Sequence, residues 1–549
     1  MDIADYIVVG GGSAGCILAN RLSEDPKTTV NLVEAGGEGK GFWVDMPVGV
    51  VKLVGNPNTD WCYLTEPDPS LNGRQLFWNA GKMLGGSSAL NGLVYIRGQR
   101  DDYDAWEKLG CAGWSFNEVF PYFLKGEHWE GEADFQSHGR NGTLSVAPLR
   151  SPHPLEDAYI SACRNYGLPY LEDYCGGNID GVFRGVTNQR WGRRCSAEKA
   201  FIEPVRNRPN LHILTRTQVS RIEFEGRRAV GIEGTRADGT PVRLRARREI
   251  VLAAGATQSP VLLMRSGVGP GSHLAEHGID VVADRRGVGQ NLMEHPALSL
   301  KWRINRRSLN HELLSTYQQG RSFLRYLFQG RGAMTSSLGY VMAGLKTLPD
   351  MQHPDAMIFF SSFVMDPSKP SRTPGRASLY PLMKDNATAA STFVNRPYSR
   401  GQIRLRSARP EDHPIIAPGL LGDERDVATL VRAAKTIEAI FASPGLAEIC
   451  EAPLYERPQT EAEWVELVRN FTGLGWHASG TCRMGGDADA VVDPRLRVNG
   501  VHGLRVVDAS IFPVVPSTNT NAPAMMVGEK GADMIRQDQQ AGQRVREPA

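Results

Sequence analysis

The sequence predicts an α/β fold, and three observations carry this prediction. Residues 6–9 form a continuous apolar run of β-branched character, which is typical of a buried parallel strand. A glycine-rich turn at residues 10–15 follows and leads into residues 16–22, whose apolar positions fit one face of a short helix. Residues 29–34 then form a second strand. This order of strand, helix and strand is typical of a parallel sheet.

The turn carries the pattern Gly-x-Gly-x-x-Gly at Gly10, Gly12 and Gly15. These glycines allow a tight turn, a close backbone approach to a pyrophosphate, and close packing of helix on strand. Glu34 ends the second strand near the expected offset of ~20 residues, where it can accept hydrogen bonds from ribose hydroxyls. In this context the pattern predicts a Rossmann-like dinucleotide site, although it does not separate a flavin from a nicotinamide dinucleotide. Residues 267–271 fit a second site badly, so we expect one dinucleotide per chain.

Three later segments have readable patterns. Residues 219–252 alternate, with turn signals at Glu225-Gly226 and Asp238-Gly239, and predict a β-hairpin or meander that returns to a core strand. Residues 366–378 are rich in proline and serine and predict a loop. Residues 536–549 are polar and predict a frayed tail.

The composition is that of a globular chain. With 549 residues, 41% apolar and 22% charged, it can bury a large core, and its length suggests two or three domains. The 62 basic and 60 acidic side chains leave a net charge of +2, which excludes a strong field toward nucleic acid and favours a small or neutral partner. Eight cysteines without a C-x-x-C pair favour reduced thiols, and we predict no metal site.

The N-terminus lacks the lysines and arginines of a signal peptide, and no apolar run approaches the ~18 residues of a membrane span. We therefore expect a cytoplasmic chain. Peripheral membrane contact and the oligomeric state stay open.

A second glycine-rich block, residues 81–92, can wrap phosphates or a ring system, or it can form a tight loop; its composition favours neither. Further ordered motifs occupy residues 81–98, 255–260, 266–269, 289–292, 477–485, 507–510 and 519–523. Together with the fingerprint and Glu34, they make nearly the whole chain resemble the glucose-methanol-choline (GMC) oxidoreductases, FAD-dependent enzymes that oxidise alcohols.

The resemblance implies a Rossmann-like FAD-binding domain of the p-hydroxybenzoate hydroxylase type with an inserted α+β substrate-binding domain. On this analogy, the FAD-binding domain comprises residues 1–154, 191–299 and 466–540, the substrate-binding domain residues 155–190 and 300–465, and a polar tail residues 541–549. Some relatives tether the flavin through a histidine, whereas the matching position here is Leu90, so we expect FAD to be non-covalent. The resemblance implies FAD contacts at Gly10, Gly12, Ser13, Ala14, Gly15, Glu34, Ala35, Gly81, Gly85, Gly86, Ser87, Asn91, Gly92, Val94, Val219, Ala254, Gly255, Trp476, His477, Asp508, Ala509, Asn521 and Pro523.

Hydride transfer from an alcohol needs a base for the hydroxyl proton and a donor to the developing alkoxide. His477 matches the family's base position, and its ordinary pKa of ~6.5 predicts that flavin reduction rises with pH near that value. Asn521 matches the position at which relatives carry histidine or asparagine, and an amide can donate to the substrate oxygen but cannot act as a base. Asn519 is close in sequence, and we favour Asn521 on the match alone. Cys482 is expected to pack only, and Trp476, Trp61 and Tyr63 either line the substrate cavity or belong to the core.

The expected activity is FAD-dependent oxidation of a primary alcohol to the aldehyde, with electrons passed to a quinone-like or other acceptor. The sequence leaves open an oxygen-using alcohol oxidase, a choline dehydrogenase and a flavin-containing cyanohydrin lyase. Choline is slightly disfavoured, because residues 334–348, expected in the substrate domain, contain no acid for its quaternary ammonium. A redox-inert FAD-binding protein is poorly supported, since both His477 and Asn521 are present.

Overall fold

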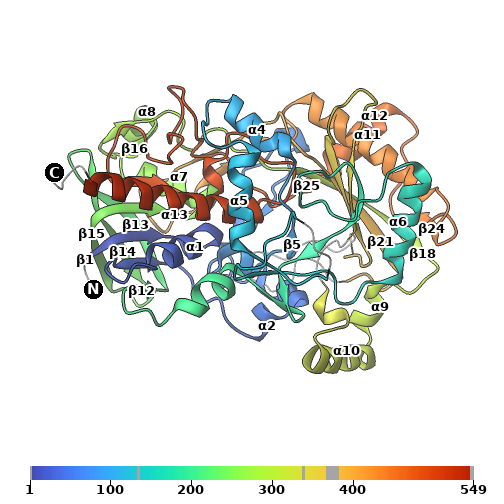
Figure 1. Cartoon of the computed structure of the whole chain (residues 1–549). Coiled ribbons are helices and arrows are strands. Elements are labelled where there is room, and N and C mark those ends of the chain that lie inside the picture. The colour runs from blue at the N-terminus through green and yellow to red at the C-terminus, as the bar shows by residue number, and fades with distance from the viewer. Residues whose placement is uncertain (1–2, 133–135, 337–340, 367–381, 545–549) are drawn as a thin grey trace.

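The computed structural model describes residues 3–132, 136–336, 341–366 and 382–544. Figure 1 shows two sheets at opposite ends of the molecule, a mainly parallel sheet near both termini and an antiparallel sheet at the other end. No helix within these described ranges is long and apolar enough to cross a membrane.

The first sheet is built around β1 (Ile3–Val9), which pairs in parallel with β2 (Val30–Val33) and β15 (Pro241–Leu252). The sheet continues in parallel through β12 (Leu211–Leu214) beside β2 and through β26 (Leu504–Val506) beside β15. Both predicted N-terminal strands are therefore confirmed. The parallel order brings the carboxyl ends of β1, β2 and β15 to the same edge, which is where ligands bind in open α/β sheets.

The predicted meander forms an antiparallel extension of this sheet. β13 (Thr217–Glu225) pairs with β14 (Arg228–Arg236), and β14 pairs with the first half of β15. The two turns fall at the predicted signals, where Gly226 and Gly239 have positive φ angles of 60° and 87°. That backbone conformation favours glycine and explains the signals.

The predicted first helix is α1 (Ser13–Leu22), and it packs against α13 (Asn521–Arg544). The expectation of a frayed tail from residue 536 is wrong as far as residue 544, because α13 continues to Arg544. Ion pairs hold this part of α13: Arg536 contacts Glu24 at 2.7 Å, and Asp538 contacts Arg505 at 2.8 Å. Residues 545–549 lie outside the described residues, as does the predicted loop at 366–378 apart from its first residue.

The second sheet is antiparallel and has the order β19-β20-β21-β18-β24, with β25 paired to the start of β18. Its packing against helices rests on aromatic pairs: Trp302 of β18 stacks on Phe441 of α11 at 3.8 Å, and Tyr159 of α6 stacks on Phe360 of β20 at 4.6 Å. The elements involved are β18 (Pro296–Ile304), β19 (Val341–Leu345), β20 (Ala356–Ser361), β21 (Ala387–Val394), β24 (Cys450–Pro453), β25 (Gly473–Leu474), α6 (Pro154–Tyr166), α11 (Glu424–Phe441) and α12 (Glu461–Phe471).

The expected division into an FAD-binding and a substrate-binding domain stays a prediction. Its boundaries after residues 154, 299 and 465 fall inside α6, β18 and α12. A division that keeps these elements whole places the boundaries a few residues away.

The remaining elements are shorter or peripheral. The helices are α2 (Phe42–Asp45), α3 (Val50–Leu53), α4 (Arg100–Lys108), α5 (Phe116–Gly126), α7 (Gly255–Arg265), α8 (Gly271–Glu276), α9 (Leu309–Leu314) and α10 (Thr316–Gln329). The strands are β3 (Tyr63–Leu64), β4 (Phe77–Trp78), β5 (Val94–Tyr95), β6 (Glu127–Trp129), β7 (Leu144–Val146), β8 (Gly181–Arg184), β9 (Val186–Thr187), β10 (Gln189–Arg190), β11 (Arg193–Arg194), β16 (Val268–Gly269), β17 (Ala283–Asp284), β22 (Gln402–Arg404) and β23 (Ile415–Ala417).

Candidate active site

The glycine fingerprint forms the turn between β1 and α1. Gly10 has a φ of 101°, and a Cβ there would lie 2.5 Å from the Ala253 carbonyl oxygen. A Cβ at Gly15 would lie 1.9 Å from the Gly10 oxygen. Neither position has room for a side chain. The first turn of α1, at Ser13 and Ala14, has Gly12 as its N-cap and no side chain capping it, so its N–H groups are available to an anion.

The second glycine block packs directly on the fingerprint. The Gly85 N–H donates to the Gly11 oxygen at 2.7 Å, and a Cβ at Gly86 would lie 2.7 Å from the Gly12 Cα. Within the block, the Gly81 N–H donates to the Ser87 hydroxyl at 3.1 Å. Because the block closes over the fingerprint rather than joining distant core elements, its position favours the cofactor cradle over the plain loop.

Glu34 lies at the carboxyl end of β2, beside Ala35, with its carboxylate aimed at the fingerprint. It accepts the N–H groups of Gly11 and Gly36, each at 2.8 Å. Burial raises the pKa of this carboxyl, against the lowering effect of those two donors. The Thr217 N–H donates to the Glu34 carbonyl at 2.9 Å, which brings the start of β13, and with it the buried Val219, to the same edge.

A second helix begins beside the fingerprint. The Ala253 N–H donates to the Val9 carbonyl at 2.8 Å, and α7 starts two residues later, after Ala254. Asp508 accepts the Gly255 N–H at 2.9 Å, and burial raises its pKa. Ser259 also donates its hydroxyl to Asp508, at 2.6 Å.

The rest of the expected contact set continues the second block. The Asn91 side-chain oxygen accepts Arg194 at 2.9 Å, which fixes the turn at Gly92, and Val94 follows as a buried residue of β5. Leu90 is buried in a small apolar cluster that includes Val44, Leu53, Val54, Met83 and Ala89. No reactive side chain therefore stands at position 90.

These features fit a dinucleotide. Glycines without room for a Cβ, a helix N-terminus whose first-turn donors are uncapped, and a buried carboxylate at the end of β2 suit a pyrophosphate and a ribose.

His477 lies in a loop that is hydrogen-bonded to the segment after β26. The Gly480 N–H donates to the Ala509 carbonyl at 3.2 Å, and the Cys482 N–H donates to the Ser510 carbonyl at 2.8 Å. Asp508 directly precedes Ala509 in the chain. These hydrogen bonds therefore hold His477 in a fixed position relative to the sheet edge where the dinucleotide site lies. Cys482 itself is buried, and burial raises its pKa, which supports packing over nucleophilic chemistry.

Two consecutive hydrogen bonds fix which ring nitrogen of His477 carries its proton. His295 Nε2 lies 2.9 Å from the Asn395 carbonyl, which only accepts, so Nε2 carries the proton of His295. Burial lowers the pKa of His295 to about 3, so its other nitrogen, Nδ1, is bare. His477 Nδ1 lies 2.8 Å from that atom and must donate to it. The lone pair of His477 is therefore on Nε2.

Asn519 contacts this lone pair, and Asn521 does not. The Asn519 amide nitrogen lies 2.9 Å from His477 Nε2, whereas Asn521 Oδ1 accepts the Ser13 hydroxyl at 2.8 Å. The expectation that Asn521 partners the base is thus corrected. The reason is local: α13 begins at Asn521 beside the start of α1, with Pro523 buried in its first turn, while Asn519 lies in the loop before it.

The antiparallel sheet supplies the surroundings of the base. Phe393 of β21 stacks on His295 with ring centroids 4.4 Å apart and meets His477 edge-on at 5.5 Å. Burial, and then the neighbouring His295, lower the pKa of His477 well below its ordinary value. The expected rise of flavin reduction near pH ~6.5 is therefore moved to lower pH, because a desolvated imidazole resists protonation.

Glu294 forms hydrogen bonds with the backbone of both histidines. Its carboxyl group accepts the backbone N–H of His477 at 2.8 Å and that of His295 at 2.9 Å. Burial raises the pKa of Glu294 to about 8. Sequence reasoning missed Glu294 and His295, although both follow the motif at residues 289–292 directly. Asn395 left no sequence signal, because it acts through its backbone carbonyl.

The three aromatic candidates do not gather around His477. Trp61 stacks on Tyr63 with centroids 5.7 Å apart, and the Tyr63 hydroxyl contacts Gln258 of α7. Trp476 is 51% exposed and has a positive φ of 62°. It directly precedes His477 in the chain, but its side chain is not part of the buried surroundings of the base.

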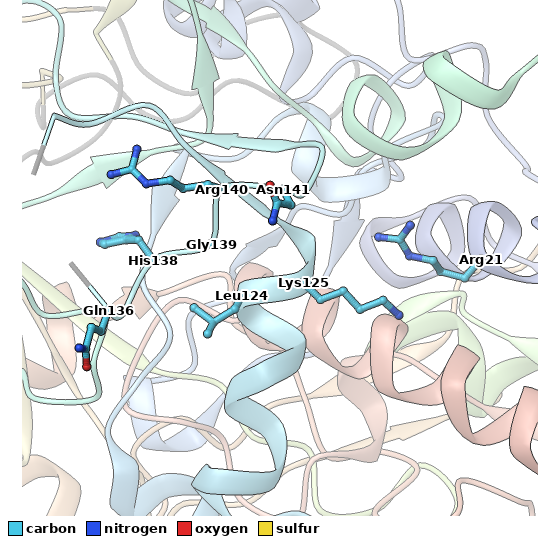
Figure 2. A pocket seen from close by; sticks show the side chains of 8 residues that line it. All are labelled: Arg21, Leu124, Lys125, Gln136, His138, Gly139, Arg140 and Asn141. Carbon is cyan, nitrogen blue, oxygen red and sulfur yellow. The ribbon is translucent and has the colours of Figure 1, made fainter. Parts of the chain in front are cut away.

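A pocket of about 640 Å³ does not include these residues. Figure 2 shows it lined by the end of α5, by residues of the 136–141 segment and by Arg21 of α1. Its cations already have partners: Glu529 contacts Arg21 at 2.6 Å and Lys125 at 3.1 Å. Burial opposes protonation of His138, but hydrogen bonds with Asp173, with Cys175 and with Glu127 outweigh it and raise the pKa of His138 to about 11. The residues that line the pocket are Arg21, Leu124, Lys125, Gln136, His138, Gly139, Arg140 and Asn141.

The chain is similar to known proteins over nearly its whole length. Two family models described as GMC oxidoreductase match residues 4–297 and 397–528. The alcohol dehydrogenase (acceptor) of Pseudomonas putida is 36% identical over 97% of this chain and 95% of its own length. The mitochondrial choline dehydrogenase of Homo sapiens is 37% identical over 97% of this chain and 90% of its own length. The crystal structure of pyridoxine 4-oxidase from Mesorbium loti has a TM-score of 0.85 and 31% identity, covering 97% and 99% of the two chains.

Proposed function

This chain belongs to the GMC oxidoreductase family, and we propose that it oxidises a primary alcohol to the aldehyde with His477 as base. The family makes it an FAD-dependent oxidoreductase that acts on CH–OH donors. The finer assignment rests on one observation: His477 Nε2 presents a lone pair whose neighbour, at 2.9 Å, is an amide donor from Asn519.

The two groups suit one substrate oxygen. His477 Nε2 and Asn519 Nδ2 are close enough that one hydroxyl oxygen can lie within hydrogen-bonding distance of both. The hydroxyl then donates its proton to Nε2 and accepts from the amide, which stabilises the developing alkoxide. The Nδ1 proton of His477 stays hydrogen-bonded to His295 while His477 Nε2 accepts the proton of the substrate hydroxyl. FAD supplies the hydride acceptor when bound.

A second atom of Asn519, its side-chain oxygen Oδ1, is open to a ligand at this site. It is buried, and the structure gives it no hydrogen-bond partner among the described residues. A buried polar atom without a partner is uncommon in a plain core and is typical of a site that a ligand completes.

Leu90 supports a non-covalent cofactor. The position that carries a tethering histidine in some relatives is here an aliphatic side chain, buried against Met83 and Ala89. An aliphatic carbon has no nucleophile with which to bind the flavin ring.

We propose a quinone-like or other electron acceptor, in line with the alcohol dehydrogenase (acceptor) of Pseudomonas putida, whose name specifies only an acceptor. Oxygen and choline stay alternatives, since relatives include oxygen-dependent choline dehydrogenases. A cyanohydrin lyase differs from all of these in leaving its flavin oxidised throughout.

The test is anaerobic mixing of the holoenzyme with a panel of primary alcohols, choline and a cyanohydrin. We expect at least one primary alcohol to bleach the flavin, and reoxidation to be faster with a quinone than with dissolved oxygen. Cleavage of the cyanohydrin without bleaching by any alcohol would overturn the proposal. Faster reoxidation by oxygen would leave the alcohol assignment intact and reverse the acceptor.

The cytoplasmic location is also a proposal. All eight cysteines are free thiols, six of them buried. Free thiols in this number suit a reducing compartment, and cell fractionation with an antibody to the protein tests the location.

A further inference from the structure

Helix α10 has an apolar side that faces solvent. Figure 1 shows α9 and α10 standing out from the body of the molecule below the antiparallel sheet. The buried residues of α10 are Ser322 and Tyr326, which identify the side that packs on the protein. On the other side, Tyr317 is 74% exposed, Leu324 55% and Phe328 75%. With about 100° per residue, spacings of seven and four place these three within about 40° of one another, at the centre of the solvent face.

Neighbouring elements enlarge this apolar area. Phe42 of α2 contacts Phe323 of α10 with ring centroids 5.8 Å apart, and it also contacts Trp43 at 5.0 Å. At the end of α10, a Cβ at Gly330 would lie 2.3 Å from the Trp191 carbonyl, so Trp191 is adjacent. We call the exposed set the α10 surface, and it consists of Phe42, Trp43, Trp191, Leu314, Tyr317, Leu324, Leu327 and Phe328.

The charged side chains of α10 itself are all basic, while the neighbouring helices α2 and α9 carry the acids Asp45 and Glu312. Arg321 and Arg325 lie along one edge of the stripe, and residues 316–329 include no acid. No ion pair within the described ranges involves either arginine. Two further cations lie over its tryptophans: Lys52 over Trp43 at 6.0 Å and Arg150 over Trp191 at 5.9 Å.

We propose that the α10 surface docks this protein onto an anionic lipid surface. Exposed aromatic and leucine side chains insert at the headgroup boundary, and arginines beside them contact lipid phosphates, which is the combination of an interfacial helix. A contiguous apolar patch of this kind is uncommon on a monomer that stays in water. The proposal depends neither on His477 nor on the identity of the electron acceptor.

A second copy of the chain fits the same surface less well. Two-fold pairing would set the α10 surface against itself, so Arg321 and Arg325 of one copy would approach cations of the other. An anionic membrane supplies both the apolar phase and the opposite charge.

The experiment is flotation of purified holoenzyme with vesicles of phosphatidylcholine, with and without phosphatidylglycerol. We expect the wild type to float with the vesicles that contain phosphatidylglycerol and to be released by high salt. The triple variant Tyr317→Ser, Leu324→Ser, Phe328→Ser should partition at least about tenfold less. Arg321→Gln with Arg325→Gln should weaken binding to anionic vesicles by about fivefold per arginine.

Phe471→Ser is the matched control. Phe471 is 64% exposed at the end of α12, far from α10 in Figure 1, and this variant should float like the wild type. FAD content and anaerobic flavin reduction, measured in every variant, show that each is folded. Wild type that stays unbound, or a triple variant that floats equally, overturns the proposal. So does a wild-type oligomer that the triple variant converts to monomer, since the surface is then an interface between copies.

Discussion

His477 Nδ1 lies 2.8 Å from His295 Nδ1, and only one of these two nitrogens carries a proton. The Asn395 carbonyl accepts a hydrogen bond from the Nε2–H of His295, so His295 Nδ1 has no proton and His477 Nδ1 is the donor. The imidazole that the family resemblance marks as a base is thus held in the tautomer whose lone pair faces Asn519. The orienting partner comes from 182 residues away in the chain.

Replacing His295 should impair the base without removing it. His295→Leu removes the acceptor for the His477 Nδ1 proton, so we expect anaerobic flavin reduction to slow by about 10- to 100-fold at unchanged FAD content. His295→Gln offers an amide oxygen to that proton and an amide N–H to Asn395, and it should recover most of the rate. Equal rates in the Leu and Gln variants would show that the hydrogen bond to His477 is irrelevant.

Asn519 and Asn521 should have separable roles. Asn519→Ala removes the donor beside His477 and should slow flavin reduction by ~10²–10³-fold with FAD retained. Asn521→Ala removes the acceptor of the Ser13 hydroxyl at the start of α1, and its main effect should be lower FAD occupancy. Stopped-flow reduction and the flavin-to-protein absorbance ratio, measured on both variants, distinguish the two. The reverse pattern would restore Asn521 as the partner of the base.

Glu34 should control cofactor affinity. Glu34→Ala removes the acceptor of the Gly11 and Gly36 N–H groups and of the ribose hydroxyls, each bond worth ~1.5–3 kcal/mol to a charged acceptor. We expect FAD affinity to fall at least about tenfold in titrations of the deflavinated protein. Glu38→Ala, a change at an exposed neighbour, serves as the control and should bind like the wild type. Equal affinities in both variants would remove Glu34 from the site.

The flavin should leave the protein intact. Leu90 offers no atom for a covalent bond, so acid precipitation is expected to release all of the yellow colour into the supernatant. The released compound should have the mass of FAD. Colour that stays with the precipitate would show a tether elsewhere in the chain.

The dinucleotide end of the site can be predicted from the sequence, because it depends mainly on residues that are close together in one βαβ unit. Gly10 and Gly15 are required by close contacts within the turn or with Ala253 at the end of the adjacent strand β15, and Glu34 follows at a fixed spacing along one βαβ unit. The same holds for the meander turns at Gly226 and Gly239, whose positive φ angles are a property of the turn itself.

The arrangement of residues around the base cannot be predicted from the sequence in this way. Whether Asn519 or Asn521 faces His477 depends on the residue at which α13 begins, and two residues separate a donor to the base from a partner of Ser13. His295 precedes β18 and His477 follows β25, and these two strands, which are far apart in the chain, pair in the antiparallel sheet and so bring the two histidines together. Burial, which lowers the pKa of His477, is likewise a product of that assembly.

The most direct test is the rate of anaerobic flavin reduction as a function of pH. The base must be unprotonated, so the rate rises as pH rises through the pKa of His477, and burial places that pKa below ~6.5. We predict a wild-type rate that is flat above pH ~6.5 and falls only in more acidic solution. His477→Ala should lose this dependence and ~10²–10⁴-fold of the rate while keeping FAD. A His477→Ala variant that retains both the wild-type rate and its pH profile would contradict the assignment of the base.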